Sequence, residues 1–185
     1  MAPGLTALLL SCNEEANLAR TLAALEPLVP VLQQLVLIDS CSTDQTVAIA
    51  HRHVPAGIAL QVHQRPFDSF AAQWNFGLAK VHTPWVLSLD ADYVLPPQLA
   101  QELLAALAAA PADLAGFEVR FRFCVGGRPL AAALLPPRVA LFRPACGHYC
   151  DDGHTQRLVI EGRLGRLRQP IHHDDRKPLD RWLTA

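Results

Sequence analysis

Residues 85–97, from Trp85 to Pro97, read WVLSLDADYVLPP. The run WVLSL is short and almost wholly apolar, which is typical of a strand that is buried on both faces of a sheet. Asp90 and Asp92 follow directly, although burying unpaired carboxylates is costly and two of them repel each other. Residues i and i+2 of an extended chain point to the same side, so the two carboxylates can converge. The stretch therefore predicts a buried strand that ends in an open or cation-binding site, with a solvated turn as the alternative.

Three similar apolar runs precede this stretch, and a helix-like segment follows each of the four. We expect strands over 5–10, 35–40, 58–64 and 85–90, and helices over 16–25, 42–53, 69–81 and 96–110. Buried strands that alternate with helices indicate an α/β fold with a doubly wound, mostly parallel sheet and helices on both faces.

The second half of the chain has a different pattern. Residues 116–130, GFEVRFRFCVGGRPL, alternate as a half-buried strand does and then reach a glycine turn. One face would carry Phe117, Val119, Phe121 and Phe123, and the other Glu118, Arg120 and Arg122. Short strands are expected over 138–144 and 156–167, which makes this half a mixed or antiparallel extension. We expect a loop over Leu130–Pro137 that faces the acceptor or a membrane, with an ordinary packed loop as an equal alternative.

The composition is that of a folded protein, because 51% of the 185 residues are apolar and 18% are charged. A formal net charge of -1 gives no basic field for binding nucleic acid. No apolar run approaches the ~20 residues of a membrane-spanning helix. We expect a cytoplasmic protein with its five cysteines as thiols, and peripheral contact with the inner face of a membrane stays open. The C-terminal RKPLDRWLTA, with Leu179, Trp182 and Leu183 at helical spacing, suggests a truncated helix.

Polar residues follow three of the predicted strands at the edge where open parallel sheets bind ligands. They are Ser11 to Glu14, Asp39 with Ser40, and Asp90 with Asp92. Neither GxGxxG nor GxxxxGK[ST] occurs, which argues against a dinucleotide-binding dehydrogenase or a P-loop enzyme. A divalent cation would relieve the repulsion between neighbouring carboxylates, and Mg²⁺ often takes one or two carboxylates plus substrate phosphates.

Three stretches, at 8–25, 36–50 and 74–92, together resemble the nucleotide-sugar-binding half of the family 2 glycosyltransferases, which have the GT-A fold. They read LLLSCNEEANLARTLAAL, VLIDSCSTDQTVAIA and WNFGLAKVHTPWVLSLDAD. Residues 151–182 are similar to a branch related to lipopolysaccharide-core glycosyltransferases. The resemblance implies one GT-A-like domain over 1–185, with a nucleotide-sugar half over 1–110 and an acceptor half over 111–185.

The resemblance also implies roles for single residues. Asp39 would accept a hydrogen bond from the uracil ring N–H, Asp90 would face the ribose, and Asp92 would bind a metal that bridges the diphosphate. The loop after the first strand would hold the base and ribose through Ser11, Asn13 and Glu14.

Two further positions bear on the nucleotide. Arg65 stands where the family often has a basic residue near the nucleotide, although a surface arginine is an equal alternative. The third helix of the family often has a cation before its asparagine, whereas this chain has Trp74 before Asn75. That departure puts direct phosphate contact by the helix in doubt. Asn75 would then hydrogen-bond within the site, and Trp74 would pack in the core.

An inverting transfer needs a base that takes the proton of the acceptor hydroxyl. The family places this residue in the second half, where Asp151 and Asp152 occur, and we favour Asp152. Asp-Asp-Gly is also a turn-forming sequence. His173 is the expected additional metal ligand, since a histidine there often faces the diphosphate in the family; the alternative is that His172 and His173 are solvated histidines beside Asp174 and Asp175.

The sequence predicts a metal-dependent, inverting glycosyltransferase that uses Mg²⁺ or Mn²⁺ and a nucleotide-diphosphate sugar, with UDP favoured. Its acceptor would be a glycan or a lipid-linked glycan. Two other functions stay open: a non-catalytic sugar-nucleotide-binding module, and a metal-dependent phosphatase or nucleotidyltransferase. A structural zinc site is a less favoured interpretation of Cys146, His148, Cys150 and His154.

Overall fold

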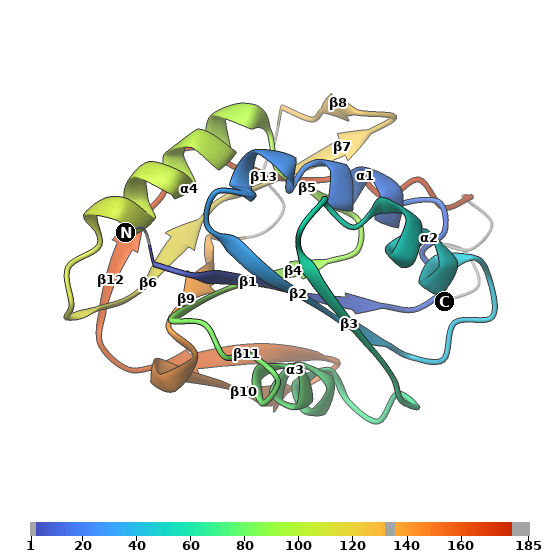
Figure 1. Ribbon diagram of the computed structural model, residues 1–185, viewed down its shortest axis with the longest axis horizontal. Helices are drawn as coiled ribbons and strands as arrows, with labels where there is room; N and C mark the ends of the chain where they lie inside the picture. The colour runs from blue at the N-terminus through green and yellow to red at the C-terminus, as the bar shows by residue number, and fades with distance from the viewer. Residues whose placement is uncertain (1–2, 132–135, 179–185) are drawn as a thin grey trace.

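A seven-stranded mixed sheet runs through the computed structural model, which describes residues 3–131 and 136–178 (Figure 1). Its order is β12-β6-β9-β4-β1-β2-β3. The strands are β1 (Leu5–Ser11), β2 (Leu32–Asp39), β3 (Ala59–Gln64), β4 (Trp85–Asp90), β6 (Leu114–Val119), β9 (Arg138–Phe142) and β12 (Arg163–Arg166). Strands β1 to β4 are parallel, and β9 pairs antiparallel with both β4 and β6. Because β2 and β4 flank β1, the chain reverses direction across the sheet there, which creates a crevice at the carboxyl ends of β1 and β4.

Helices cover both faces of this sheet, as the alternating pattern predicts (Figure 1). On one face lie α1 (Leu18–Ala23), α2 (Thr46–His53) and α4 (Pro97–Ala109), and on the other α3 (Phe70–Leu78). The hairpin of β10 (Gly147–Asp152) and β11 (Thr155–Ile160) packs beside α3. Short 3-10 helices occupy Glu26–Leu28 and Pro144–Cys146. The expected doubly wound α/β architecture is confirmed.

The alternation of side chains along β1 divides the core between the two faces. Leu5 and Leu9 pack with α1 and α4, whereas Leu8 packs with α3 and with Trp74 of that helix. Trp74 is 3% exposed, so the expectation that it packs in the core is confirmed. Gly77 lets α3 approach the sheet, because a Cβ atom there would lie 2.5 Å from Leu8 Cδ1.

A second, four-stranded sheet corrects the expectation of one alternating strand after residue 116. Arg120 separates two strands. Strand β6 ends before it and belongs to the large sheet, whereas β7 (Phe121–Val125) begins after it and belongs to the small one. The other small-sheet strands are β5 (Tyr93–Val94), β8 (Arg128–Pro129) and β13 (Ile171–His173). Local alternation could not reveal the break, because the strand that joins β7 to the rest of the small sheet, β13, lies about fifty residues along the chain. The mixed extension itself is confirmed.

The start of α2 is also corrected, from residue 42 to Thr46. Ser42 does not cap the helix, because its backbone N–H and hydroxyl both donate to Asp39. The carboxylate of Asp44 instead accepts from the backbone N–H of Thr46 at 2.9 Å.

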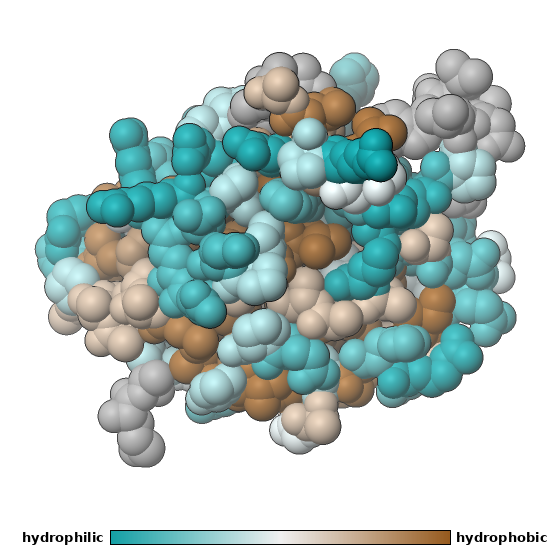
Figure 2. Space-filling view, turned by 90° about the horizontal axis from the view of Figure 1, so that it is seen from above, coloured by the Kyte–Doolittle hydropathy of each residue, from teal (hydrophilic) through white to brown (hydrophobic). Residues whose placement is uncertain are grey.

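Two expected features lie partly or wholly outside the described residues: the centre of the Leu130–Pro137 loop and the C-terminal helix with Leu179, Trp182 and Leu183. Within residues 3–131 and 136–178, no helix has the length and apolar character needed to cross a membrane. Hydrophilic residues cover much of the helix-bearing face that is seen from above, and apolar residues show between them (Figure 2).

Candidate active site

Strand register brings the three polar strand ends to one edge of the sheet. Leu10 pairs with Asp90, and Ser11 pairs with Asp39. A cavity of about 430 Å³ opens at this edge. We call it the donor cavity, after the nucleotide-sugar donor that the sequence predicts for this edge. Its lining includes Ser11, Glu14, Asp90, Asp92 and His173, which the sequence predicted for one site, and also Lys177 and Arg138. The cavity lies at the switch point between β1 and β4, where open α/β sheets bind ligands.

Asp92 and His173 form the polar centre of the donor cavity. The pairing of β13 with β5 sets His173 opposite Tyr93, and the His173 Nε2 atom lies 2.9 Å from Asp92 Oδ2. Burial alone would lower the pKa of His173, but the hydrogen bond and negative charge of Asp92 outweigh it and raise the pKa. Asp92 Oδ1 and His173 Nδ1 are buried and have no hydrogen-bond partner among the described residues. Such unsatisfied atoms call for an explanation, and a bound cation is one.

Asp90 lies near Asp92 and His173, in surroundings that disfavour its charged form. Burial, together with the nearby carboxylate of Asp92, raises the pKa of Asp90 to about 6. A hydrogen bond with Tyr93 acts in the opposite direction. Burial and the same carboxylates also raise the pKa of the Tyr93 hydroxyl. The charged form of Asp90 is therefore disfavoured within this cavity.

The loop after β1 is tied to the segment that follows β13. The buried carboxylate of Glu14 accepts from Asn17 Nδ2 at 2.8 Å and from Lys177 Nζ. Asp174 is 4% exposed, and its carboxylate accepts from Arg20 at 2.7 Å. Burial raises the pKa of Glu14, although Lys177 and Asn17 counteract it.

Asp39 is fully buried, and its hydrogen-bonding capacity is used within the protein. Its carboxylate accepts from the Ser11 hydroxyl at 2.9 Å, from the backbone N–H and hydroxyl of Ser42, and from Gln64 Nε2 at 3.2 Å. These bonds join the loops that follow β1 and β2. A base N–H could reach this carboxylate only by displacing one of them, so direct contact between Asp39 and a base stays a prediction.

Asn13 also links these two loops. Its side-chain oxygen accepts from the Thr43 backbone N–H at 2.9 Å, and its own backbone N–H donates to the Ser42 hydroxyl at 2.8 Å. Asn13 and Cys41 have positive φ angles of 53° and 56°. Such strained positions are concentrated at functional sites. Asn13 lines a smaller cavity of about 290 Å³, which shares Lys177 with the donor cavity.

Arg65 and Asn75 are directed elsewhere. The Arg65 guanidinium binds Asp68 at 2.7 Å and the carbonyl of Ala72 at 3.1 Å. Asn75 exchanges two hydrogen bonds with the backbone of Tyr149, at 2.8 and 2.9 Å, and so fixes α3 to β10. Neither residue is among the described residues that line the donor cavity. Their predicted roles at the nucleotide stay a prediction.

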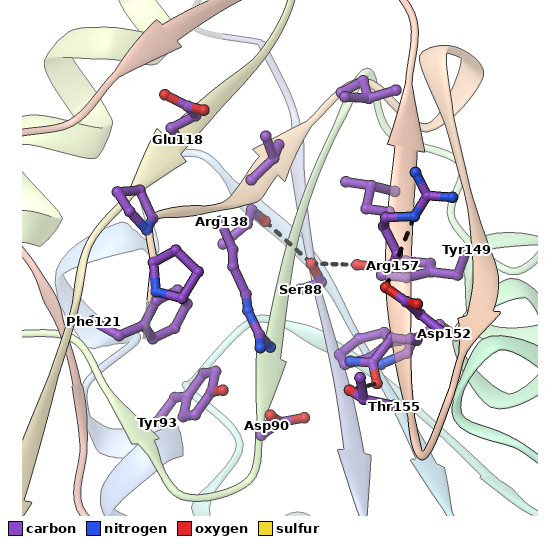
Figure 3. Close-up of a pocket in the computed structure, with 18 of the residues that line it drawn as sticks. Ser88, Asp90, Tyr93, Glu118, Phe121, Arg138, Tyr149, Asp152, Thr155 and Arg157 are labelled. Atoms are coloured by element: carbon purple, nitrogen blue, oxygen red, sulfur yellow. Dashed lines mark hydrogen bonds and ion pairs between the residues drawn. The ribbon is translucent and has the colours of Figure 1, made fainter. Parts of the chain in front are cut away.

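A second cavity of about 480 Å³ adjoins the first (Figure 3). We call it the acceptor cavity, after the acceptor half that the sequence predicts over 111–185. Both cavities are lined by Asp90, Arg138, Thr155 and Gln156. The Arg138 side chain extends from β9 toward Asp90 and lies between the two sides of the cavity (Figure 3). Asp152 lines this cavity and lies 4.0 Å from Arg157, whereas Asp151 is not among the described residues that line it. Of the two candidate bases, Asp152 is the one at the cavity.

The wall opposite Arg138 is built by buried polar and aromatic groups. The Tyr149 hydroxyl donates to the Ser88 hydroxyl at 2.9 Å, and Ser88 donates to the Ala140 carbonyl (Figure 3). The Tyr149 ring stacks on Trp74, with 5.3 Å between ring centroids. This packing holds the β10–β11 hairpin, and with it Asp152, against the main sheet.

Sequence reasoning missed Arg138 and Lys177. Arg138 follows a proline pair, and Lys177 follows two aspartates, but neither pattern reveals which distant strand end the residue faces. The zinc interpretation finds no support, because the described residues contain no group of three or more His, Cys, Asp or Glu side chains that could hold a metal by themselves.

Comparison with solved structures identifies the class of fold. The chain matches the structure of S. aureus TarS residues 1–349, solved with UDP-GlcNAc, with a TM-score of 0.68 and 16% identity over 95% of this chain and 59% of that one. It also matches the mannosyltransferase PcManGT from Pyrobaculum calidifontis, solved with GDP-Man and Mn²⁺, with a TM-score of 0.55 and 22% identity over 66% and 36% of the two chains. The fold is the GT-A fold, as expected.

The family model described as glycosyl transferase family 2 matches residues 6–155, and the chain belongs to this family. A curated relative, the lipopolysaccharide core biosynthesis glycosyltransferase LpsC of Rhizobium meliloti (strain 1021), is 34% identical over 167 residues. That match covers 89% of this chain and 60% of LpsC. The chain thus spans 60% of the length of LpsC and 59% of the TarS chain. The resemblance to a lipopolysaccharide-core branch is confirmed.

Proposed function

We propose that this chain carries the catalytic domain of a glycosyltransferase that takes a sugar from a nucleotide-diphosphate donor, with UDP as the favoured nucleotide. The observation that carries the proposal is the pair of adjoining cavities at the switch point of the sheet. The donor cavity gathers Asp90, Asp92 and His173, and the acceptor cavity contains Asp152. The two share Asp90 and Arg138, so groups bound in them would meet. Family membership supports the same conclusion.

The residues present fit a divalent cation, Mg²⁺ or Mn²⁺. Asp92 Oδ1 is a buried oxygen that lacks a partner among the described residues, and His173 is bonded to the other oxygen of the same carboxylate. Two protein ligands are enough where substrate phosphates and water complete the coordination. We propose that Asp92 and His173 hold the cation, which would offset the charge that develops on the leaving diphosphate. Two solved relatives by fold, PcManGT and a glucosyl-3-phosphoglycerate synthase from Mycobacterium tuberculosis, contain Mn²⁺ and a nucleotide.

The rest of the donor cavity would take the nucleoside. Ser11 and Glu14 line it, Asp90 lies where a ribose or the transferred sugar would sit, and Asp39 and Asn13 hold the surrounding loops. A carboxylic acid with a raised pKa is a suitable hydrogen-bond partner for a sugar hydroxyl, since it can donate as well as accept.

In the proposed inverting reaction, an acceptor hydroxyl forms the new bond to the anomeric carbon while the bond to the diphosphate breaks. Asp152 takes the proton of that hydroxyl, and the diphosphate leaves with the bonding electron pair. Arg157 lies 4.0 Å from Asp152 and lines the same cavity. We propose a glycan or lipid-linked glycan of the cell envelope as the acceptor, and action in the cytoplasm at the inner face of the membrane. The similarity to LpsC supports the envelope glycan.

Thermal stabilisation by nucleotides tests the proposal. A panel of UDP-, GDP- and CMP-sugars is measured with and without Mn²⁺ on the wild-type protein and on Asp92→Ala. We expect stabilisation by UDP-sugars that requires Mn²⁺ and is lost in Asp92→Ala. Asp113→Ala is the matched control, because Asp113 is an exposed carboxylate that pairs with Arg163 and does not line the donor cavity. No response of well-folded protein to any nucleotide would refute the proposal, and binding without transfer would favour a non-catalytic module.

A further inference from the structure

Lys177 lies in the donor cavity although no motif in the sequence points to it. It follows His173 by four residues and lines both the donor cavity and the smaller cavity beside Asn13. Its side chain is 21% exposed, so the ammonium is largely withdrawn from bulk water but still reaches the cavity. Its position is therefore that of a group built into the wall of the site.

The backbone around Lys177 is held in place by a dense set of polar contacts. Asp174 donates its backbone N–H to the carbonyl of Asp92 at 3.1 Å, which attaches this segment to the strand end. The Lys177 backbone N–H donates to Asp175 Oδ1 at 2.9 Å, and the same oxygen accepts from Asn17 at 2.7 Å. These bonds fix where the lysine side chain starts.

The hydrogen-bonding capacity of the ammonium exceeds what the protein supplies. A lysine ammonium has three N–H groups. Among the described residues, Glu14 is the acceptor within hydrogen-bond distance, and the Asp175 carboxylate lies farther away, at 3.8 Å. Two N–H groups thus have no acceptor within hydrogen-bond distance among residues 3–131 and 136–178, in a site where water is partly excluded. The nearby carboxylates, with Glu14 first, raise the pKa of Lys177 against the effect of burial, so the group stays cationic.

A diphosphate is the ligand that these unused donors fit. A diphosphate carries at least two negative charges and several acceptor oxygens, with which Lys177 can pair. The positive charge of Lys177 matters because the other ionisable residues that line the cavity include the acidic Asp90 and Asp92. Lys177 and Asp92 line the same cavity, so the ammonium and the proposed cation would face one ligand. A neutral sugar or a base would add no charged partner for Lys177 to the carboxylates of Glu14 and Asp175 that already face it.

Resting on the proposed function, we infer that Lys177 is a binding residue for the diphosphate of the donor and that the negative charge of Glu14, beside its ammonium, weakens the attraction between Lys177 and the phosphate. In the free protein Glu14 holds the ammonium in place. When a nucleoside diphosphate binds, the remaining N–H groups donate to phosphate oxygens. The contact between Lys177 and the phosphate stabilises the bound donor and the departing diphosphate alike, and it needs no movement of the backbone.

The test compares the affinities of UDP and uridine, measured by calorimetry at fixed Mn²⁺ concentration, for wild type, Lys177→Met, Lys177→Arg and Glu14→Gln. The ratio of the two affinities isolates the diphosphate, because both ligands share the nucleoside. We expect Lys177→Met to lower this ratio about tenfold, as loss of a charge-assisted hydrogen bond implies, and Lys177→Arg to recover part of it. Glu14→Gln should raise the ratio. Lys80→Met is the matched control, because Lys80 lies over the Phe76 ring and should leave the ratio unchanged.

Each other outcome overturns the inference. Equal loss of UDP and uridine affinity in Lys177→Met would make Lys177 only a structural partner of Glu14. An unchanged ratio in Lys177→Met would exclude contact with the diphosphate. A ratio that falls in Glu14→Gln as it does in Lys177→Met would mean that the ion pair itself shapes the site. If wild-type protein binds neither UDP nor another nucleoside diphosphate, the proposed function fails together with the inference.

Discussion

Replacing Asp90 by asparagine should stabilise the metal-free protein at neutral pH. Burial and the carboxylate of Asp92 raise the pKa of Asp90 from the ordinary 3.8 to about 6. A difference of about two pKa units corresponds to roughly 3 kcal/mol of free energy of unfolding. This is an upper value, because Asp90 is partly open to the cavity and the substitution also changes its hydrogen bond with Tyr93.

The sign of the effect follows from proton binding. The folded protein binds the Asp90 proton more tightly than the unfolded chain does, so this group makes no unfavourable contribution below about pH 4. The folded state loses stability as the pH rises from about 4 to about 6, and the full penalty is present above that range. Asp90→Asn removes the titration. The variant should be more stable than wild type at pH 7.5, by up to about 3 kcal/mol, and gain little at pH 4.

Urea denaturation in EDTA at pH 4, 6 and 7.5 measures the difference. The control is Asp113→Asn, because Asp113 is an exposed carboxylate in an ion pair with Arg163, and its replacement should not stabilise the protein at pH 7.5. The reasoning is wrong if the difference between Asp90→Asn and wild type is the same at all three pH values, or if the variant is less stable at pH 7.5.

Three further predictions concern catalysis and packing. Asp152→Asn should lower the turnover number about 100-fold or more while UDP affinity stays within twofold, and Asp151→Asn should have little effect in the same steady-state assay; the reverse order would assign the base to Asp151. Gly77→Ala should reduce the free energy of unfolding by about 1–3 kcal/mol, because its Cβ would meet Leu8 Cδ1 at 2.5 Å; no change in urea denaturation would contradict this packing. Asp39→Asn should reduce the free energy of unfolding by about 1–3 kcal/mol, because the new amide N–H would face a hydrogen-bond donor of Ser42. An unchanged melting temperature would show that the hydrogen bonds of Asp39 are dispensable for stability.

Much of the large sheet could be predicted because its signals are local. The stretches 5–10 and 85–90 are apolar runs that end in polar residues, and each is followed by a helix pattern. Parallel strands place their carboxyl ends at one edge, so the convergence of Ser11, Asp39 and Asp90 followed from fold class alone. The division of 116–125 into two strands did not follow, because the alternation continues across the break and only the pairing partners differ.

The sequence by itself determined the alternating α/β order, the place of the carboxylates at strand ends and the family. Tertiary structure alone decided which distant groups meet them. Pairing of β13 with β5 sets His173 against Asp92, 81 residues away in the chain, and the segment beyond brings Lys177 to Glu14 across 163 residues. Periodicity and capping act over a few residues, whereas these contacts depend on strand pairing between remote segments. For that reason the chemistry of Asp92 could be read from its strand, but its partners could not.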